Sequence, residues 1–191
     1  MIDESKLNDL NFAKDSKLLT PKKREEFYKK IIKLADYKIV IVEPPEIDAA
    51  LESQELNLNW LEAHKSAEII IELCPDEAHI DCPSPNIERY KSYLKDLLKT
   101  NREVDLWVGH KMELKSKVVA AASIIAKVTR DNIIEEIKKK YGDIGPGYMS
   151  NIITQKFLKE NWEKHPEIFR KSWISWKNHK NHKEQKGLGE F

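Results

Sequence analysis

Two carboxylates, Asp81 and Glu113, occupy positions where they could hold a metal ion. Asp81 ends the short run EAHID, and Glu113 follows the run VDLWV after a few residues. If both runs are strands, these side chains lie at the carboxyl ends of neighbouring strands, where α/β proteins place reactive groups. Carboxylate oxygens are the hard ligands that Mg²⁺ and Mn²⁺ prefer, and such ions assist phosphodiester cleavage. From these residues alone, two unrelated surface acids remain an alternative.

The stretch from His110 to Asp131 must position one of these carboxylates. It begins with charged residues and becomes small and apolar between Val118 and Ala126. Small residues from Ala120 to Ser123 let a helix backbone approach a neighbouring surface closely. We therefore expect a tightly packed helix with a charged entrance. A buried helix whose solvated end has no catalytic role explains the same pattern.

Alternating strand and helix patterns predict an α/β domain whose sheet is at least partly parallel. Thr20 and Pro21 form a helix start, with a hydroxyl cap and a proline in the first turn. Strands are expected over residues 37–42, a β-branched run, and over residues 77–81 and 104–108. Besides the helices after Thr20 and His110, helices are expected over residues 2–12, 46–51, 58–73, 87–99 and 154–162.

Composition excludes several protein classes. Lys and Arg number 33 against 32 Asp and Glu, so the net charge of +1 does not indicate a nucleic-acid partner. The two cysteines form no disulfide framework and have no metal-ligand spacing, which predicts a reducing, intracellular setting. No apolar run reaches membrane-spanning length, and the start of the chain is not a signal segment. A chain of 191 residues suits one domain with at most a small helical appendage.

Two segments in the last third of the chain carry residue types that suit a nucleic-acid surface. From Arg170 onward, basic residues are interleaved with Trp173 and Trp176. Cations can meet a phosphate backbone and flat rings can meet sugars or bases, although a solvated helix end explains this segment about as well. The glycine-rich loop Tyr141–Tyr148 either allows a close backbone approach or simply turns the chain.

Six segments resemble those of archaeal-type ribonuclease HII in order and spacing. They are KDSKLLTPKKREE (Lys14–Glu26), LNLNWLEA (Leu56–Ala63), PDEAHIDCPSPN (Pro75–Asn86), VVAAASIIAKVTRD (Val118–Asp131), YGDIGPGY (Tyr141–Tyr148) and RKSW (Arg170–Trp173). The resemblance implies an RNase H-like α/β fold, with a mixed sheet flanked by helices and a C-terminal helical segment. It also implies an endonuclease that hydrolyses RNA paired to DNA, including single ribonucleotides, with two metal ions (Mn²⁺ or Mg²⁺) and four carboxylates.

The same resemblance implies roles for individual residues. Asp81 matches the third family carboxylate, and Glu113 stands where the fourth, an aspartate, is expected. Tyr148 matches a tyrosine that stacks on the sugar at the ribonucleotide junction. The residues that match the lining of the hybrid-binding groove are Lys14, Asp15, Ser16, Lys17, Asn59, Lys127 and Arg130.

Departures from the family pattern lead to further expectations. The segment DEAGRG, which supplies the first two family carboxylates, has no counterpart here. We expect an N-terminally truncated chain that lacks the first, central strand of the sheet. Neighbouring strands would then have unpaired backbone groups, and the chain would be unstable or aggregate alone. Ser116-Lys117 replaces a Tyr-Pro pair, and Met149 and Asn151 replace Pro and Asp, which leaves open a catalytically silent copy.

The last residues resemble a sliding-clamp-binding motif made of Gln185, Leu188 and Phe191. A short helical turn would place Leu188 and Phe191 together in an apolar pocket on the clamp. We expect residues 1–168 to form the RNase H-like domain and residues 169–191 a basic segment that ends in this motif. The expected protein is a cytoplasmic, monomeric ribonuclease of DNA replication or ribonucleotide excision repair. The alternative is an inactive, truncated remnant that binds nucleic acid and the clamp.

Overall fold

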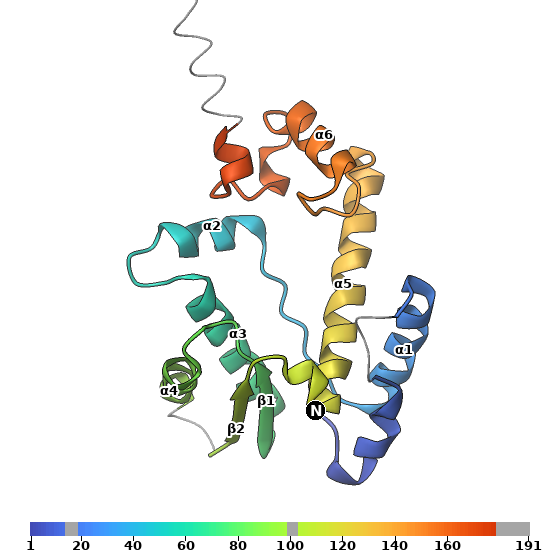
Figure 1. Cartoon of the computed structure of the whole chain (residues 1–191), viewed down its shortest axis with the longest axis vertical. Coiled ribbons are helices and arrows are strands. Elements are labelled where there is room, and N and C mark those ends of the chain that lie inside the picture. Colours follow the sequence, from blue (N-terminus) through green and yellow to red (C-terminus); the bar gives the residue numbers. More distant parts are fainter. Residues whose placement is uncertain (14–18, 99–102, 179–191) are drawn as a thin grey trace, which may run out of the picture. The chain divides into compact units, whose positions relative to one another are not determined.

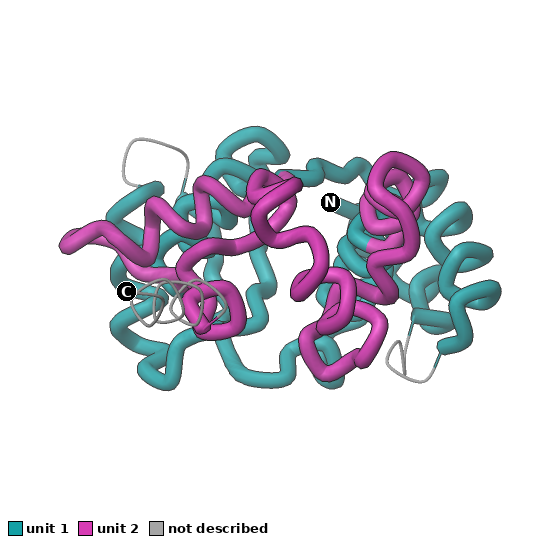
Figure 2. The backbone as a smooth tube through the Cα atoms, turned by 90° about the horizontal axis from the view of Figure 1, so that it is seen from above, with its two compact units in different colours: residues 1–40, 59–130 teal, residues 41–58, 131–191 magenta. Residues whose placement is uncertain are grey.

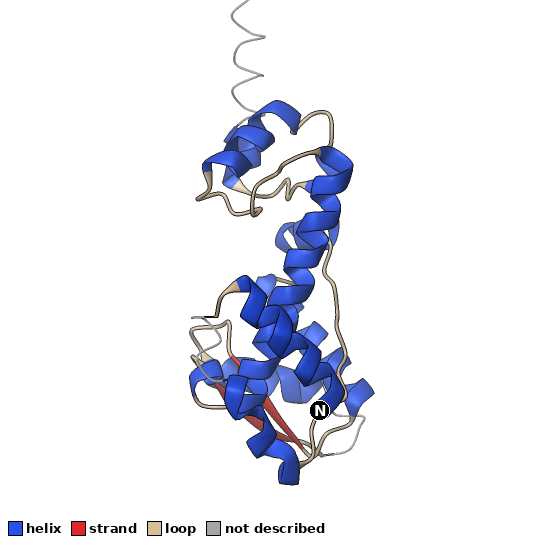
Figure 3. Cartoon of the chain, turned by 90° about the vertical axis from the view of Figure 1, so that its right-hand side faces the viewer, coloured by secondary structure: helices blue, strands red, loops and turns tan. Residues whose placement is uncertain are grey.

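The computed structural model describes residues 1–13, 19–98 and 103–178, which form helices and a small parallel sheet (Figures 1 and 3). The elements in chain order are η1 (Glu4–Ala13), α1 (Pro21–Leu34), α2 (Pro44–Glu52), α3 (Leu58–Leu73), β1 (Glu77–Asp81), α4 (Ile87–Leu97), β2 (Asp105–Gly109), η3 (Met112–Leu114), α5 (Lys117–Tyr141), α6 (Ile152–Asn161) and η4 (Pro166–Ile168). The α/β class expected from the sequence is confirmed. None of the helices among these residues is long and apolar enough to cross a membrane.

The chain divides into two compact units (Figure 2). The first comprises Met1–Val40 and Asn59–Arg130, and the second comprises Ile41–Leu58 and Asp131–Phe191. Both strands lie in the first unit, together with the amino-terminal part of α5. The candidate carboxylates therefore belong to one compact unit.

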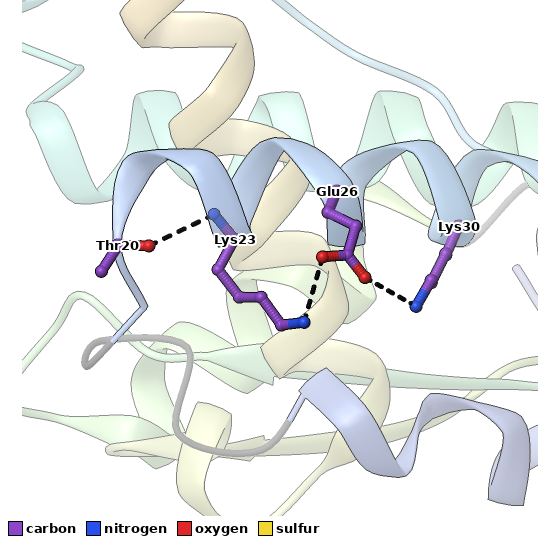
Figure 4. A network of polar contacts seen from close by, with 4 residues as sticks. All are labelled: Thr20, Lys23, Glu26 and Lys30. Carbon is purple, nitrogen blue, oxygen red and sulfur yellow. Dashed lines mark hydrogen bonds and ion pairs between the residues drawn. The ribbon is translucent and has the colours of Figure 1, made fainter.

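The start of α1 lies where Thr20 and Pro21 predict it. The hydroxyl of Thr20 accepts a hydrogen bond from the N–H of Lys23 at 3.3 Å, which satisfies a donor of the first turn (Figure 4). On the exposed side, Glu26 pairs with Lys23 at 3.0 Å and with Lys30 at 2.9 Å. Exposed ion pairs add little to stability, so this helix depends on its apolar face.

A first core forms where η1 and α1 meet the small-residue half of α5. Its buried members are Leu10, Ala13, Phe27, Ile31, Ala120, Ala121, Ile124 and Val128. Ile31 and Ile124 are each only 1% exposed. Because Ala120 and Ala121 have short side chains, the α5 backbone can lie close to this cluster. The tightly packed helix predicted after His110 is confirmed.

A second core covers one face of the sheet. β1 and β2 run parallel, and Asp81 lies opposite Gly109 at their carboxyl ends. Alternate side chains of the two strands pack with residues of α3 and α4. The strand residues that do so are Ala78, Ile80, Leu106 and Val108. Trp107 belongs to the other face and is 57% exposed. Strands and helices thus fix the sheet edge at which Asp81 lies.

The strand predicted over residues 37–42 is wrong. Residues 36–43 have no regular secondary structure, and within the described ranges the sheet contains only β1 and β2. A strand needs a neighbouring backbone to complete its hydrogen bonds. Tyr37 and Ile41 accordingly remain 46% and 52% exposed. The β-branched run has strand propensity but lacks a described partner strand.

An aromatic cluster forms part of the core of the second unit. The ring of Phe169 lies 6.0 Å from that of Phe157 and 5.9 Å from that of Trp176. Trp162 meets Trp176 edge-on, with 5.3 Å between the ring centroids. These contacts pack α6 against the segment that follows η4.

Candidate active site

Asp81 ends β1 at the carboxyl edge of the sheet, as the sequence predicts. Its Oδ1 accepts a hydrogen bond from the backbone N–H of Met112 at 2.9 Å. A charge-assisted bond from a backbone donor fixes the orientation of a carboxylate. The residue as a whole is exposed, while its hydrogen bond to Met112 is partly buried. Asp81 is therefore tied to the turn that follows β2.

Glu113 lies in that turn, within the short 3₁₀-helix η3. Because its neighbour Met112 donates to Asp81, the backbone of this turn lies at the sheet edge where Asp81 ends β1. The Oε2 atom of Glu113 is shielded from solvent. His110 fixes the start of the turn, since its Nδ1 donates to the carbonyl oxygen of Cys82 at 3.2 Å.

A side-chain bond anchors the far end of the turn. The Oγ of Ser116, a residue only 7% exposed, is hydrogen-bonded to Nδ1 of His79 at 2.9 Å. The same hydroxyl accepts the N–H of Val119 at 3.4 Å, so it also caps the start of α5. His79 precedes Asp81 by two residues on β1. The serine that replaces the expected tyrosine thus joins the sheet, the turn and α5.

A third carboxyl group in this region, Glu62 of α3, was not among the predicted site residues. Desolvation of its carboxyl group and the negative charge of Asp81 both raise the pKa of Glu62. A sequence signal was present, because Glu62 lies in the segment LNLNWLEA three residues after Asn59. Helical residues at this spacing share one face, so Asn59 and Glu62 lie on the same face of α3.

The chemistry of these side chains fits a divalent cation. Mg²⁺ binds through one or two carboxylates and keeps several waters, which suits Asp81 and Glu113. The charge of Asp81 is near enough to raise the pKa of Glu62, and a cation placed there would oppose that effect. In the part of the chain that the structure describes, no three His, Cys, Asp or Glu side chains gather as a complete ligand set. Water and substrate oxygens would complete the coordination.

The other predicted binding residues are distributed over both units. Asn59 lies on α3, and Lys127 and Arg130 lie three residues apart on α5, all in the first unit with the carboxylates. Tyr148 belongs to the second unit and is 47% exposed. The remaining predicted residues fall outside the described ranges, and they are Lys14, Asp15, Ser16, Lys17, Gln185, Leu188 and Phe191.

The loop that contains Tyr148 packs closely on α6. Gly145 and Gly147 have positive φ angles of 63° and 73°. A β-carbon on Gly145 would lie 2.9 Å from Oγ1 of Thr154, so a larger residue does not fit there. The N–H of Gly147 donates to the same hydroxyl at 3.2 Å. The close backbone approach expected from these glycines is therefore made to α6.

In the second unit, Asp48 of α2 holds the segment RKSW. Its carboxylate accepts the N–H of Lys171 at 2.8 Å, and the N–H and O–H of Ser172 at 3.1 and 2.6 Å. Burial alone would raise the pKa of Asp48, but these bonds and the charge of Arg170 outweigh it and lower the pKa. Arg170 lies over the ring of Trp173 at 4.1 Å from its centroid. A cation and a flat ring are thus ordered together.

Comparisons with known proteins agree with these observations. The family model described as Ribonuclease HII matches residues 2–176. The ribonuclease HII of Methanococcus maripaludis is 42% identical over 180 residues, which cover 91% of this chain and 74% of the relative. That of Thermococcus sibiricus is 41% identical over 181 residues, which cover 91% of this chain and 78% of the relative.

Solved structures show the same relationship. The ribonuclease H2 of Pyrococcus horikoshii has a TM-score of 0.83 at 37% identity, covering 95% of this chain and 87% of that one. The PCNA:RNase HII complex of Archaeoglobus fulgidus has a TM-score of 0.78 at 35% identity, covering 92% of this chain and 82% of that one. Bst-RNase HIII, 18% identical with a TM-score of 0.73, shares the fold alone. The RNase H-like fold is therefore confirmed, and the chain belongs to the ribonuclease HII family.

Proposed function

We propose that this chain is an endonuclease that hydrolyses the RNA strand of RNA–DNA hybrids, including the bond at a single ribonucleotide in DNA. The observation that carries the proposal is the hydrogen bond from Met112 to Asp81, which ties one carboxylate to the turn that contains the other, Glu113. Relatives that are 41–42% identical over most of the chain are ribonucleases HII, which supports this activity.

In this proposal, Asp81 and Glu113 are the residues that would hold Mn²⁺ or Mg²⁺ in a two-metal site. When bound, such ions supply an activated water and stabilise the charge on the leaving oxygen. Met112 keeps the carboxylate of Asp81 oriented while the substrate binds. Lys127 and Arg130 contribute positive charge to the same unit, which suits a polyanionic backbone.

The remaining binding residues are assigned by resemblance. Tyr148 supplies a ring for the sugar at the ribonucleotide junction, and its exposure leaves that ring accessible. The residues assigned to the hybrid-binding groove are Lys14, Asp15, Ser16, Lys17 and Asn59. Cation-rich grooves track the phosphate backbone without reading its sequence.

The same proposal includes a sliding-clamp partner. A relative from Archaeoglobus fulgidus has been solved as a complex with PCNA, and residues 185–191 have the spacing of a clamp-binding motif. We assign residues 1–168 to the nuclease domain and residues 169–191 to a basic, clamp-binding segment of a monomeric, cytoplasmic protein that acts in replication or ribonucleotide excision repair. Phe191→Ala should weaken clamp affinity by about tenfold or more, because the aromatic anchor is lost. Unchanged affinity would refute this part.

The nuclease proposal is tested by Mn²⁺-dependent nicking of a duplex that contains one ribonucleotide, with an all-DNA duplex as the substrate control. Asp81→Asn keeps an oxygen that can accept the Met112 N–H but removes the charge, so we expect a folded protein whose rate falls by about 100-fold or more. Asp105→Asn is the matched control, because Asp105 is exposed at the opposite end of the sheet.

Two results would count against the proposal. An Asp81→Asn protein that nicks as fast as its parent would remove Asp81 from the site. A parent protein that binds the ribonucleotide-containing duplex but does not nick it would instead favour the inactive nucleic-acid-binding remnant.

A further inference from the structure

The backbone of Lys111 adopts a conformation that lysine rarely has. Among the residues that the structure describes, the non-glycine positions with positive φ are Cys74, at 47°, and Lys111, at 55°. Cys74 follows the last residue of α3, where a left-handed residue commonly ends a helix. Lys111 lies instead between β2 and η3, with φ 55° and ψ 41°. L-residues other than glycine pay a steric penalty in this region, so the surroundings must impose it.

The left-handed conformation sets the direction of the next N–H group. The chain turns at Lys111, and the N–H of Met112 then donates to Oδ1 of Asp81 at 2.9 Å. The carbonyl oxygen of Lys111 accepts the N–H of Leu114 at 3.1 Å, which begins η3 and places Glu113 inside it. The backbone conformation of Lys111 thus both directs the Met112 N–H to Asp81 and begins the helix that contains Glu113.

Contacts on both sides hold Lys111 in this conformation. The side chain of Met112 is buried, and a β-carbon on Gly109 would lie 3.2 Å from its sulfur, so the two ends of the turn are closely packed. Before the turn, His110 donates to the carbonyl of Cys82 at 3.2 Å. After it, Ser116 bonds to His79 at 2.9 Å. The turn therefore has little room for a different path.

We propose that Lys111 is a positioning residue whose left-handed backbone, rather than its side-chain charge, sets the placement of Glu113 relative to Asp81. This inference rests on the proposed function, because it assigns a role within the same carboxylate site. The Lys111 side chain is exposed, so a direct contact between its ammonium group and a phosphate is the competing explanation. The two explanations predict different activities for substitutions of Lys111.

Three substitutions at this position separate backbone from charge. Lys111→Gly removes the charge but adopts positive φ readily, whereas Lys111→Val removes the charge and disfavours positive φ. Lys111→Arg keeps the charge, and arginine pays about the same steric penalty at positive φ as lysine does. We expect Lys111→Val to lower kcat by about tenfold with little change in KM, because misplaced catalytic groups act on the chemical step. Lys111→Gly and Lys111→Arg should stay within about threefold of the parent kcat.

Cys74→Val is the matched control for backbone strain. It places the same β-branched residue at the left-handed position that follows α3, outside the turn between β2 and η3. We expect it to lower Tm, as Lys111→Val does, while the kcat of the folded protein stays at the parent value. If Lys111→Gly and Lys111→Val lose activity equally, raise KM and leave only Lys111→Arg active, the charge explanation holds and the proposal fails. A Lys111→Val protein with the parent kcat also overturns it.

A second readout does not depend on activity. Hydrogen exchange of the Met112 amide reports whether its bond to Asp81 persists. We expect this amide to be protected in the parent and in Lys111→Gly, and to exchange at least about tenfold faster in Lys111→Val. If the parent does not nick but this exchange pattern is seen, the proposed function fails and the positioning geometry stands. Equal protection in all variants refutes the positioning role even if the parent is active.

Discussion

The carboxylate of Asp48 offers a stability prediction that can be worked out from its hydrogen bonds. It accepts three hydrogen bonds from Lys171 and Ser172, at 2.8, 3.1 and 2.6 Å. Hydrogen bonds to a charged group contribute about 1.5–3 kcal/mol each. The three bonds share one carboxylate, and Lys171 is exposed to water. Their combined contribution to the free energy of unfolding is therefore smaller than three times the value for one bond. We expect Asp48→Ala to lower the free energy of unfolding by about 2–3 kcal/mol.

Asp48→Asn should have an intermediate effect, of about 1–1.5 kcal/mol, because the amide keeps one acceptor oxygen but loses the charge. Glu52→Gln on the same helix is the matched control, since Glu52 is exposed, and it should stay within about 0.5 kcal/mol of the parent. Urea unfolding followed by tryptophan fluorescence measures these differences. An Asp48→Ala protein within about 0.5 kcal/mol of the parent would refute the assigned role of this contact.

The same residue gives a pH dependence with a defined sign. The pKa of Asp48 is lowered in the folded protein from its ordinary value of 3.8, because hydrogen bonds and the charge of Arg170 outweigh the opposing effect of burial. Its contribution is therefore fully present above the ordinary pKa and is lost as pH falls through the lowered pKa of the folded state. Asp48→Asn should lose less stability than the parent between about pH 5 and about pH 2. If the stability of the parent and of Asp48→Asn changed equally with pH over this range, the lowered pKa assigned to Asp48 would be contradicted.

Two further predictions concern the first unit. Ile124→Ala should cost about 2–5 kcal/mol in urea unfolding, because Ile124 is 1% exposed in the core that seats α5. The control Ile71→Ala should cost clearly less, since Ile71 is 46% exposed, and equal losses would contradict the assigned packing. The pKa of Glu62 is raised, so the parent should lose stability as pH rises from the ordinary value of 4.5 through the raised pKa. Glu62→Gln should remove that loss, and an unchanged pH profile would contradict the raised pKa of Glu62.

Local signals in the sequence predicted much of the fold. Thr20 and Pro21 mark the first residues of α1, because a capping hydroxyl and a proline at the first helical position act within one turn. The small residues around Ala120 predicted close packing of α5, since short side chains allow close approach whatever the partner is. Asp81 was placed correctly at a strand end, because the break at Cys82 and Pro83 is visible in the sequence.

Features that depend on distant partners could not be predicted in this way. Residues 37–42 have strand propensity, yet a strand forms only where another backbone pairs with it. Glu62 was missed because its proximity to Asp81 depends on how α3 packs beside the sheet. The bond between Ser116 and His79 joins residues 37 positions apart. The positive φ of Lys111 has no sequence signal, since lysine does not favour that conformation.

The central claim is that Asp81 and Glu113 act together in one site that cleaves the RNA strand. The most direct test is the single-turnover cleavage rate of the double variant Asp81→Asn/Glu113→Gln on a duplex with one ribonucleotide, compared with both single variants. Each single variant should be slower than the parent by about 100-fold or more, and the double variant should match the slower single variant within about threefold. A double variant whose loss is the product of the two single losses, or a Glu113→Gln protein that cleaves at the parent rate, would contradict the claim.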